Sequence, residues 1–283
     1  PGGDIQAANL AESLRVLASD AFEGRAPNTP GEEKTVQYIA ERFAQAGLQP
    51  AGDDGGWFQR VELERSQIAG PVRAGFTTAA GTRALVQGED IAVESLYPQD
   101  KVALEDVPLV FAGYGITAPE LGWDDYAGLD VKDKIVVILV NDPDFESGQG
   151  DFGGKAMTYY GRWTYKYEEG ARQGAAGVLV VHETDPASYG WATVKNSNTN
   201  TMFDVVRKNP KDTHPQLEGW IQRDEAVALF KNAGLDFDAL KKQAQTRDFK
   251  PVELKGETFS AKYAVDSKVI TSQNIAGRIV GSK

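Results

Sequence analysis

The sequence contains no cysteine, which excludes disulfide bonds, thiolate zinc sites and a cysteine nucleophile. It has only two histidines, His182 and His214, in 283 residues. A zinc-protease helix requires a second histidine four residues after the first, and Pro186 occupies that position after His182. We interpret His182 as a strand-end histidine bonded to the backbone and His214 as a loop histidine. No apolar run approaches the roughly 18 residues that a membrane-spanning helix requires.

Positive charge is also scarce. The chain has 30 Lys and Arg residues against 41 Asp and Glu residues, which gives a net charge of −11. Such an acidic chain is poorly suited to nucleic acid or to an anionic membrane, and we expect neither as a partner. Hydrophobic residues at 41% and charged residues at 25% are typical of a globular protein of one large or two ordinary domains. The first residue is Pro1, which we interpret as a trimmed or mature start.

The sequence contains partial matches to known binding and catalytic motifs, but none of these matches is complete. Gly113 and Gly115 fit the start of a dinucleotide fingerprint, but residues 119–124 lack the helical periodicity that a pyrophosphate site requires. No Gly-x-Ser-x-Gly nucleophile elbow occurs. Acidic residues gather in the segment 142–151, where Ser147 replaces the glycine of a calcium loop. We interpret this segment as a solvated acidic loop and leave its role open.

The spacing of apolar residues predicts helices and strands throughout the chain. The clearest helix is the second, where Thr29 and Glu32 predict a capping box, Pro30 takes the first helical position and Gly47 follows the end. The run 134–140 is apolar throughout, as expected of a strand buried on both faces. The other expected elements are a first helix capped by Asp4, helices 162–173, 223–232 and 237–244, strands 57–63, 74–78, 82–86, 107–112, 177–181, 259–265 and 274–280, and a loop over 182–214.

The most distinctive segment is the aromatic run 159–167, of which helical spacing can bury only a part. One interpretation places Trp163 and Tyr167 in the core. The other makes the helix start a recognition surface, where aromatic area lies beside a guanidinium group that can bind a carboxylate. Both interpretations stay open, and the candidate substrate-binding residues are Tyr159, Tyr160, Arg162 and Trp163.

Short motifs occur in a characteristic order along the chain. Leu-Ala-Ser-Asp at 17–20, Phe-Glu-Gly-Arg at 22–25, Thr-Pro-Gly-Glu at 29–32 and Gly-Leu-Gln-Pro at 47–50 form the first group. This group resembles the start of the co-catalytic zinc aminopeptidases, a superfamily with bacterial leucyl aminopeptidases and glutamate carboxypeptidases. The segments at 110–115, 130–137 and 171–178 are similar to the protease-associated (PA) domain often inserted in them. Residues 272–277 are similar to the strand that re-enters the peptidase domain.

The resemblance implies a mixed α/β fold in three parts. Residues 1–96 supply the first helices and strands of a peptidase domain, 97–267 form a β-rich α/β PA-type insertion, and 268–283 are a truncated re-entry strand of an incomplete zinc-exopeptidase α/β domain. In the family, the zinc ligands begin shortly after that strand with a His and an Asp two residues apart. No such pair follows here, so the resemblance implies no catalytic residue and no metal ligand in this chain. Two zinc ions are implied only for the intact parent enzyme.

We therefore expect the non-catalytic N-terminal and PA portion of a secreted or periplasmic zinc-dependent aminopeptidase. It covers the active site, shapes substrate access and is inactive by itself. Its expected partners are the remainder of the peptidase domain and a peptide substrate. The alternative is a stand-alone PA-type module that binds peptides or proteins, against which the peptidase-like segment 1–63 weighs. An enzyme of another class is disfavoured, because the sequence offers no nucleophile, base and orienting group as a set.

Overall fold

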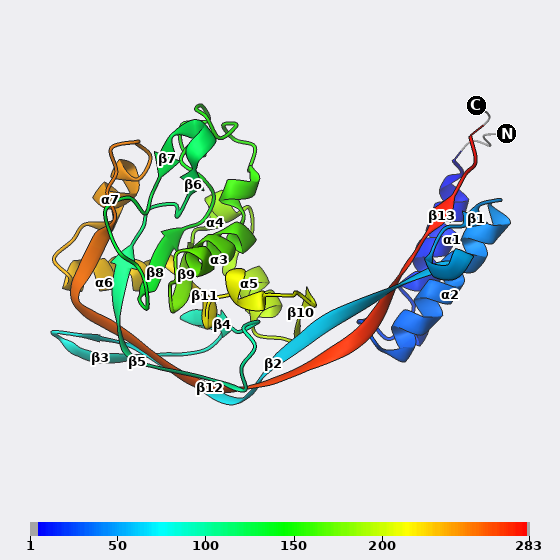
Figure 1. Ribbon diagram of the computed structural model, residues 1–283, viewed down its shortest axis with the longest axis horizontal. Helices are drawn as coiled ribbons and strands as arrows, with labels where there is room; N and C mark the ends of the chain where they lie inside the picture. Colours follow the sequence, from blue (N-terminus) through cyan, green and yellow to red (C-terminus); the bar gives the residue numbers. More distant parts are fainter. Residues whose placement is uncertain (1–4, 282–283) are drawn as a thin grey trace. The chain divides into compact units, whose positions relative to one another are not determined.

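The computed structural model describes residues 5–281 and shows a mixed α/β protein of two compact units (Figure 1). Unit 1 consists of the chain up to Glu64 together with the chain from Val269 onward, and unit 2 is Arg65–Lys268. Unit 2 is therefore inserted between two segments of unit 1. The predicted mixed α/β class is confirmed. Among the described residues, no helix has the length and apolar character needed to cross a membrane.

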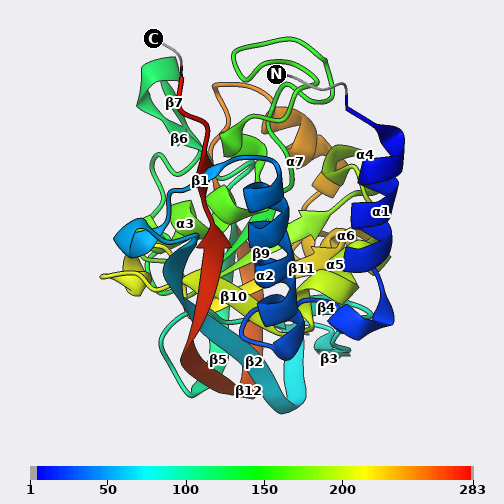
Figure 2. The same ribbon diagram turned by 90° about the vertical axis from the view of Figure 1, so that its right-hand side faces the viewer.

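Unit 1 contains the helices α1 (Ala7–Leu17) and α2 (Pro30–Gln45), which lie side by side (Figure 2). A short 3₁₀ turn, Asp20–Phe22, lies between them in the sequence. The first helix is confirmed, but it begins after Gln6, whose side chain makes no capping hydrogen bond. The predicted cap Asp4 lies outside the described residues.

The predicted capping of α2 is confirmed with one change. Thr29 Oγ1 accepts a hydrogen bond from the Glu32 amide at 3.3 Å, and Pro30 begins the helix. The Glu32 carboxylate accepts from the amide of Asn28 at 2.6 Å, one residue before the cap, and not from the amide of the cap itself. Gly47 follows the helix with a φ of +80°, the left-handed conformation that glycine adopts without strain.

A small sheet joins the two sequence segments of unit 1. The strand β1 (Gln49–Pro50) pairs antiparallel with β13 (Gly277–Arg278). A Cβ at Gly277 would lie 2.9 Å from the ring of Phe43, so a glycine is needed where this strand crosses the helix. A 3₁₀ turn, Asp53–Gly55, follows β1.

A mixed sheet forms the framework of unit 2, in the strand order β10–β2–β12–β5–β8–β9–β11–β4, with β3 paired to β2. Neighbours from β5 to β11 run parallel, whereas β12 is antiparallel to β5 and β4 is antiparallel to β11. The bounds are β2 Phe58–Thr78, β3 Gly81–Leu85, β4 Ile91–Glu94, β5 Lys101–Phe111, β8 Ile135–Leu139, β9 Gly177–His182, β10 Met202–Val205, β11 Leu217–Gln222 and β12 Val252–Ile275; β6 (Thr117–Ala118) and β7 (Trp123–Asp124) pair separately.

Helices cover both faces of the central parallel strands, which explains why β8 is apolar at every position. Tyr167 of α3 and Val194 of α5 pack on one face, and Phe230 of α6 and Phe237 of α7 pack on the other. The helices are α3 (Trp163–Arg172), α4 (Thr184–Ala187), α5 (Trp191–Asn198), α6 (Arg223–Asn232) and α7 (Phe237–Gln243).

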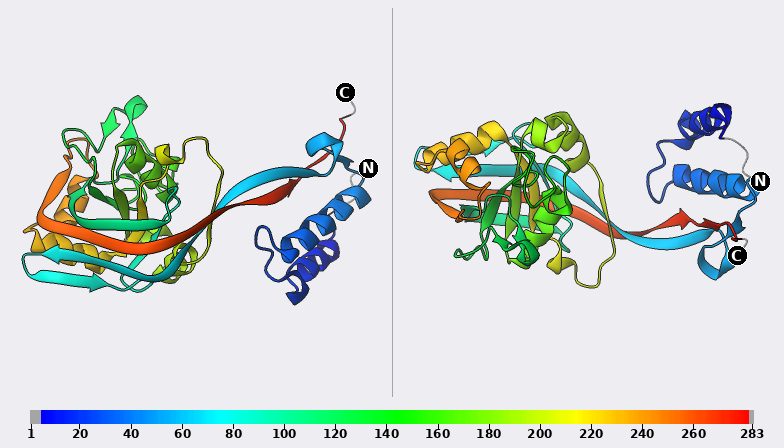
Figure 3. Two further views of the ribbon diagram at one scale, coloured as in Figure 1. Left: turned by 60° about the horizontal axis from the view of Figure 1, so that its bottom comes forward. Right: turned by 90° about the horizontal axis from the view of Figure 1, so that it is seen from above.

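The strands β2 and β12 are longer than predicted, and the chain passes between the units within them (Figure 3). The predicted strands 57–63 and 74–78 are both parts of β2. The predicted strand 274–280 is wrong in extent, because β12 continues to Ile275 and the pairing then changes to the short β13.

The observed division of the chain differs from the predicted boundaries. The first boundary was predicted at 96/97, whereas the units divide at 64/65. The division comes earlier because β3 and β4 belong to the sheet of unit 2. The predicted boundary at 267/268 lies one residue before the observed one. The predicted loop 182–214 is wrong, since it contains α4, α5 and β10, elements too short to leave a clear periodic pattern.

Removing the cap of α2 tests the local interactions of unit 1. Thr29→Ala is expected to lower the free energy for opening α2 by about 1 kcal/mol, because the Glu32 amide loses its acceptor. Native-state hydrogen exchange of the α2 amides measures this change. Thr29→Ser keeps the oxygen and is the control; an equal loss in both variants would contradict the assignment.

Candidate functional site

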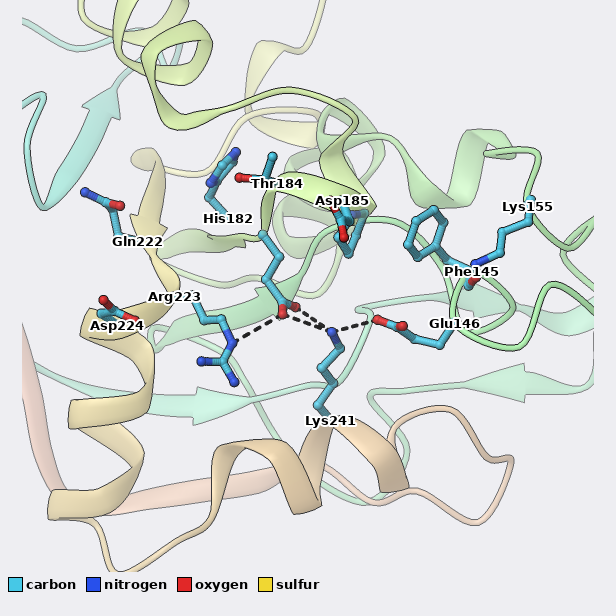
Figure 4. A pocket seen from close by; sticks show the side chains of 12 residues that line it. Phe145, Glu146, Lys155, His182, Thr184, Asp185, Gln222, Arg223, Asp224 and Lys241 are labelled. Carbon is cyan, nitrogen blue, oxygen red and sulfur yellow. Dashed lines mark hydrogen bonds and ion pairs between the residues drawn. The ribbon is translucent and has the colours of Figure 1, made fainter.

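A polar cleft of about 630 Å³ lies at the carboxyl ends of the parallel strands of unit 2 (Figure 4). Its walls come from the segments that follow β8, β9 and β11, and from α7. Parallel strands of one sheet end at the same edge, so the polar residues that follow them gather there. The lining residues are Phe145, Glu146, Lys155, His182, Glu183, Thr184, Asp185, Pro186, Gln222, Arg223, Asp224 and Lys241.

Lys241 is the centre of an ion-pair network in this cleft. Its Nζ lies 2.7 Å from Glu146 Oε1 and 2.8 Å from Glu183 Oε1. Arg223 Nε lies 3.4 Å from Glu183 Oε2 (Figure 4). Burial lowers the pKa of Lys241, but the hydrogen bonds from its ammonium to the two carboxylates raise it more, so the net shift is upward. The charged lysine therefore connects three separate segments of the chain.

His182 closes one side of the cleft at the end of β9. Its Nε2 lies 2.9 Å from the carbonyl oxygen of Tyr189, and its ring centroid is 5.6 Å from that of Trp191. Burial lowers the pKa of His182 below its usual value, so the ring is neutral at pH 7. The prediction of a strand-end histidine bonded to the backbone is confirmed.

The cleft is equipped for binding polar groups of both charges. Lys155 and Arg223 line it with cationic groups that already donate within the chain, to the Phe145 carbonyl and to the carboxylates of Glu183 and Asp238, and the exposed side chains of Asp185 and Asp224 offer acceptors. Within residues 5–281, no group of three or more His, Asp or Glu side chains could hold a metal ion. The described residues thus do not fit a zinc site, and the chemistry that they support at the cleft is recognition through hydrogen bonds and charge.

The structure divides the predicted recognition surface into two parts. Tyr159 and Tyr160 lie in a 3₁₀ turn. The Tyr159 hydroxyl donates a hydrogen bond to the Glu168 carboxylate at 2.8 Å, and the Tyr160 hydroxyl donates to the Glu120 carboxylate. The Tyr160 ring also lies edge-on to Phe152, at 5.8 Å between centroids. These two tyrosines are therefore engaged in intramolecular contacts, although Tyr159 remains 56% exposed.

Arg162 and Trp163 lie on a different surface. Both line a pocket of about 340 Å³ together with Met157 and Tyr189. Trp163 is half-buried and packs on Tyr167 with ring centroids 5.7 Å apart, which agrees with the core interpretation of that pair. The Arg162 side chain is exposed at the N-cap of α3. The segment 182–189 lines this pocket with its last residues and the polar cleft with its first ones.

The predicted solvated acidic loop is wrong for its first residues. Asp142 and Asp144 are buried, at 0% and 6% exposure. Asp144 accepts hydrogen bonds from the backbone amides of Phe152, at 2.6 Å, and Gly154, at 3.3 Å. The two carboxylates hold the loop in shape, because buried acceptors need such donors. The pattern of alternating acidic residues contained no signal for this burial.

Lys166 is a fully buried lysine that the sequence analysis missed. Its Nζ donates to the carbonyl oxygens of Tyr114 and, at 2.8 Å, Asn141. Burial lowers the pKa of Lys166, against the opposing influence of Asp125 and Asp142. The lysine joins the loop after β8 to the turn after β5. Lys166 and Tyr167 stand three and four residues after Trp163, so all three lie on one face of α3. This spacing was the sequence signal for the burial of Lys166.

His214 is more constrained than a simple loop histidine. Its Nδ1 lies 2.8 Å from Glu218 Oε1 and its Nε2 lies 2.9 Å from Asp204 Oδ2. Glu94 stands directly opposite Glu218 in the β4–β11 pairing, and burial raises the pKa of Glu94 well above its usual value. Burial lowers the pKa of His214, but the two carboxylates outweigh it and raise the pKa to about 9. The imidazolium is thus the stable form at pH 7.

No family model and no curated protein matches the sequence. Among solved structures, the chain is similar to an aminopeptidase from Aneurinibacillus sp. strain AM-1, with a TM-score of 0.44 and 20% sequence identity. The match covers 96% of this chain and 47% of that one, so this chain spans about half the length of that structure.

The His214 cluster predicts a specific pH dependence of stability. The folded-state pKa of about 9 exceeds the ordinary 6.5, so the stabilisation is fully present below about pH 6.5 and is lost as the pH rises through 9. Urea denaturation across this range should show a decline in wild type that is smaller in His214→Gln. Because His214 also lowers the pKa of Glu218 and Glu94, the difference between the two proteins reports on the histidine together with its carboxylate partners. Identical pH profiles would contradict the assignment.

Proposed function

We propose that the chain is the non-catalytic N-terminal and PA portion of a zinc-dependent aminopeptidase of the secreted or periplasmic kind. In this proposal, unit 2 is the PA-type domain, which covers the active site and shapes substrate access. The segments of unit 1 are parts of a peptidase domain whose remaining elements bind the metal. The order of the sequence motifs and the insertion of unit 2 between two segments of unit 1 support this assignment.

The core of unit 1 is the observation on which the proposal rests. Among its described residues, the buried apolar side chains are Val36, Ala40 and Ile270. The helix α1 buries none of its residues, and Leu14 is 68% exposed. A unit with so small a core gains too little from apolar burial to offset its chain entropy. Further protein that covers this apolar surface would supply the missing burial.

The sheet of unit 1 supports the same conclusion. Within the described residues, β1 and β13 pair only with each other. An isolated two-stranded pair is marginally stable in water, and its open edges favour the addition of further strands. The exposed side chain of Ile279, at 81%, continues the apolar surface just beyond β13.

Unit 2 has a core of its own on both sides of its parallel strands, as a folded insertion requires. We assign its contact with peptide substrate to the edge that carries the polar cleft and the Arg162 pocket. Both hollows border the segment 182–189, so a short peptide could contact both. The exposed Arg162 guanidinium suits a substrate carboxylate, and the exposed carboxylates of Asp185 and Asp224 suit an ammonium group.

The alternative function is a stand-alone PA-type module that binds peptides or proteins. The complete core of unit 2 is compatible with it. Hydrogen exchange of the purified chain separates the two: our proposal expects rapid exchange in α1 and α2 beside strong protection in β8 and β9. Equal protection in both units would favour the stand-alone module.

The purified 283-residue chain is expected to be inactive as a peptidase. Incubation with leucine p-nitroanilide and added zinc should release no nitroaniline above the rate without protein, because the described residues do not form a metal site. An aminopeptidase of known activity, assayed in the same buffer, is the positive control. Release that a chelator abolishes would refute the non-catalytic assignment.

Substitution of Arg162 tests the substrate-contact surface in the intact peptidase that carries this chain. Arg162→Ala should raise KM by about tenfold and change kcat little, because the guanidinium would bind a remote substrate group equally in ground and transition states. Arg73→Ala removes another exposed arginine of unit 2 and is the matched control. Unchanged KM and kcat in both variants would contradict a role of Arg162 in substrate binding.

A further inference from the structure

The pocket beside the start of α3, with a volume of about 340 Å³, has mostly apolar walls. Val140 and Ala187 line it as buried residues, at 4% and 3% exposure. Met157, Trp163 and Tyr189 are half-buried and contribute thioether and aromatic surface. Small-ligand sites combine such walls with a few polar groups that fix the orientation of the ligand. The pocket therefore has the size and the lining of a site for a small apolar group.

Arg162 is the charged side chain that lines this pocket. Within residues 5–281, its guanidinium group has no hydrogen-bond or ion-pair partner, and no Asp or Glu is among the lining residues. Burial raises the pKa of the Tyr189 hydroxyl, and the positive charge of Arg162 opposes this rise, so the guanidinium lies near that wall. The pocket thus combines its apolar walls with a positive charge that no described carboxylate neutralises.

The backbone at the pocket rim is held in an uncommon conformation. Ser188 has a φ of +67°, in the left-handed region that favours glycine. Such a conformation costs free energy and persists where surrounding contacts enforce it, often at binding sites. One such contact is the hydrogen bond from Asn141 Nδ2 to the carbonyl oxygen of Pro186, at 2.8 Å, which fixes the segment 182–189 against the loop after β8. The pocket is therefore formed before a ligand enters, which lowers the entropic cost of binding.

We propose that this pocket binds the C-terminal residue of a peptide whose last side chain is bulky and apolar. The α-carboxylate pairs with the Arg162 guanidinium, and the side chain packs among Met157, Trp163 and Tyr189. An acidic last side chain is disfavoured, because its second carboxylate would be desolvated among apolar walls. The inference rests on the substrate contact proposed for unit 2, and it adds the class of residue that is bound.

Binding of N-acetyl-L-phenylalanine to the purified 283-residue chain tests the proposal. Amide NMR shifts of Gly161, Trp163, Ala187 and Tyr189 should change and saturate with this ligand. N-acetyl-L-phenylalaninamide lacks the charge and N-acetylglycine lacks the ring, so each should bind at least about tenfold more weakly. Absence of saturable shifts would overturn the proposal, as would equal affinity for either of the two control ligands.

Arg162→Gln should weaken binding of the acid by about tenfold or more and leave binding of the amide unchanged. The Arg162 side chain makes no capping hydrogen bond to α3, so the variant should keep the helix. Arg73→Gln removes another exposed arginine of unit 2 and should bind the acid as wild type does. Unaltered affinity of Arg162→Gln for the acid would refute the assignment. Should that variant fail to fold, the comparison of the three ligands on wild type still decides the question.

This experiment separates the pocket assignment from the proposed function. Binding is measured without catalysis, so its absence would refute the pocket assignment alone. The non-catalytic peptidase assignment is decided by nitroaniline release and by hydrogen exchange in α1 and α2, neither of which involves the pocket.

Discussion

The burial of both faces of β8, β9 and β11 is the constraint on which the rest of unit 2 depends. Strands without a solvent face favour apolar side chains along their length, with the buried Glu218 of β11 as an exception, so most polar residues gather where the strands end. The parallel pairing places those ends at one edge. The cleft, the Arg162 pocket and the buried loop carboxylates all follow from this arrangement.

Buried or half-buried lysines fix the loops at that edge. Lys166 joins the loop after β8 to the turn after β5, and Lys241 joins α7 to two acidic loops. Such contacts contribute modestly to net stability, since desolvation offsets much of the attraction. Removing one partner is costly, because it leaves an uncompensated charge in a low dielectric. The networks therefore favour one loop arrangement over others more than they strengthen the fold.

The two units differ in how far each can stabilise itself. Unit 2 has helices on both faces of its sheet and large buried side chains such as Phe111 and Trp220. Unit 1 has well-capped local structure in α2 but little apolar burial. Local signals form helices, whereas burial between elements makes them persist. This contrast is the physical basis for proposing that unit 1 is completed by further protein.

The sequence alone determined the elements that depend on neighbouring residues. Thr29, Pro30 and Gly47 mark the two ends of α2, the apolar run marks β8, and the bounds predicted for α6 are the observed ones. The tertiary structure decided what depends on distant residues. These features include the network of Lys241 and the two carboxylates around His214. The Lys241 network joins α7 to two loops that only the tertiary fold brings together, and the spacing of residues within one segment contains no information about a partner in a distant segment.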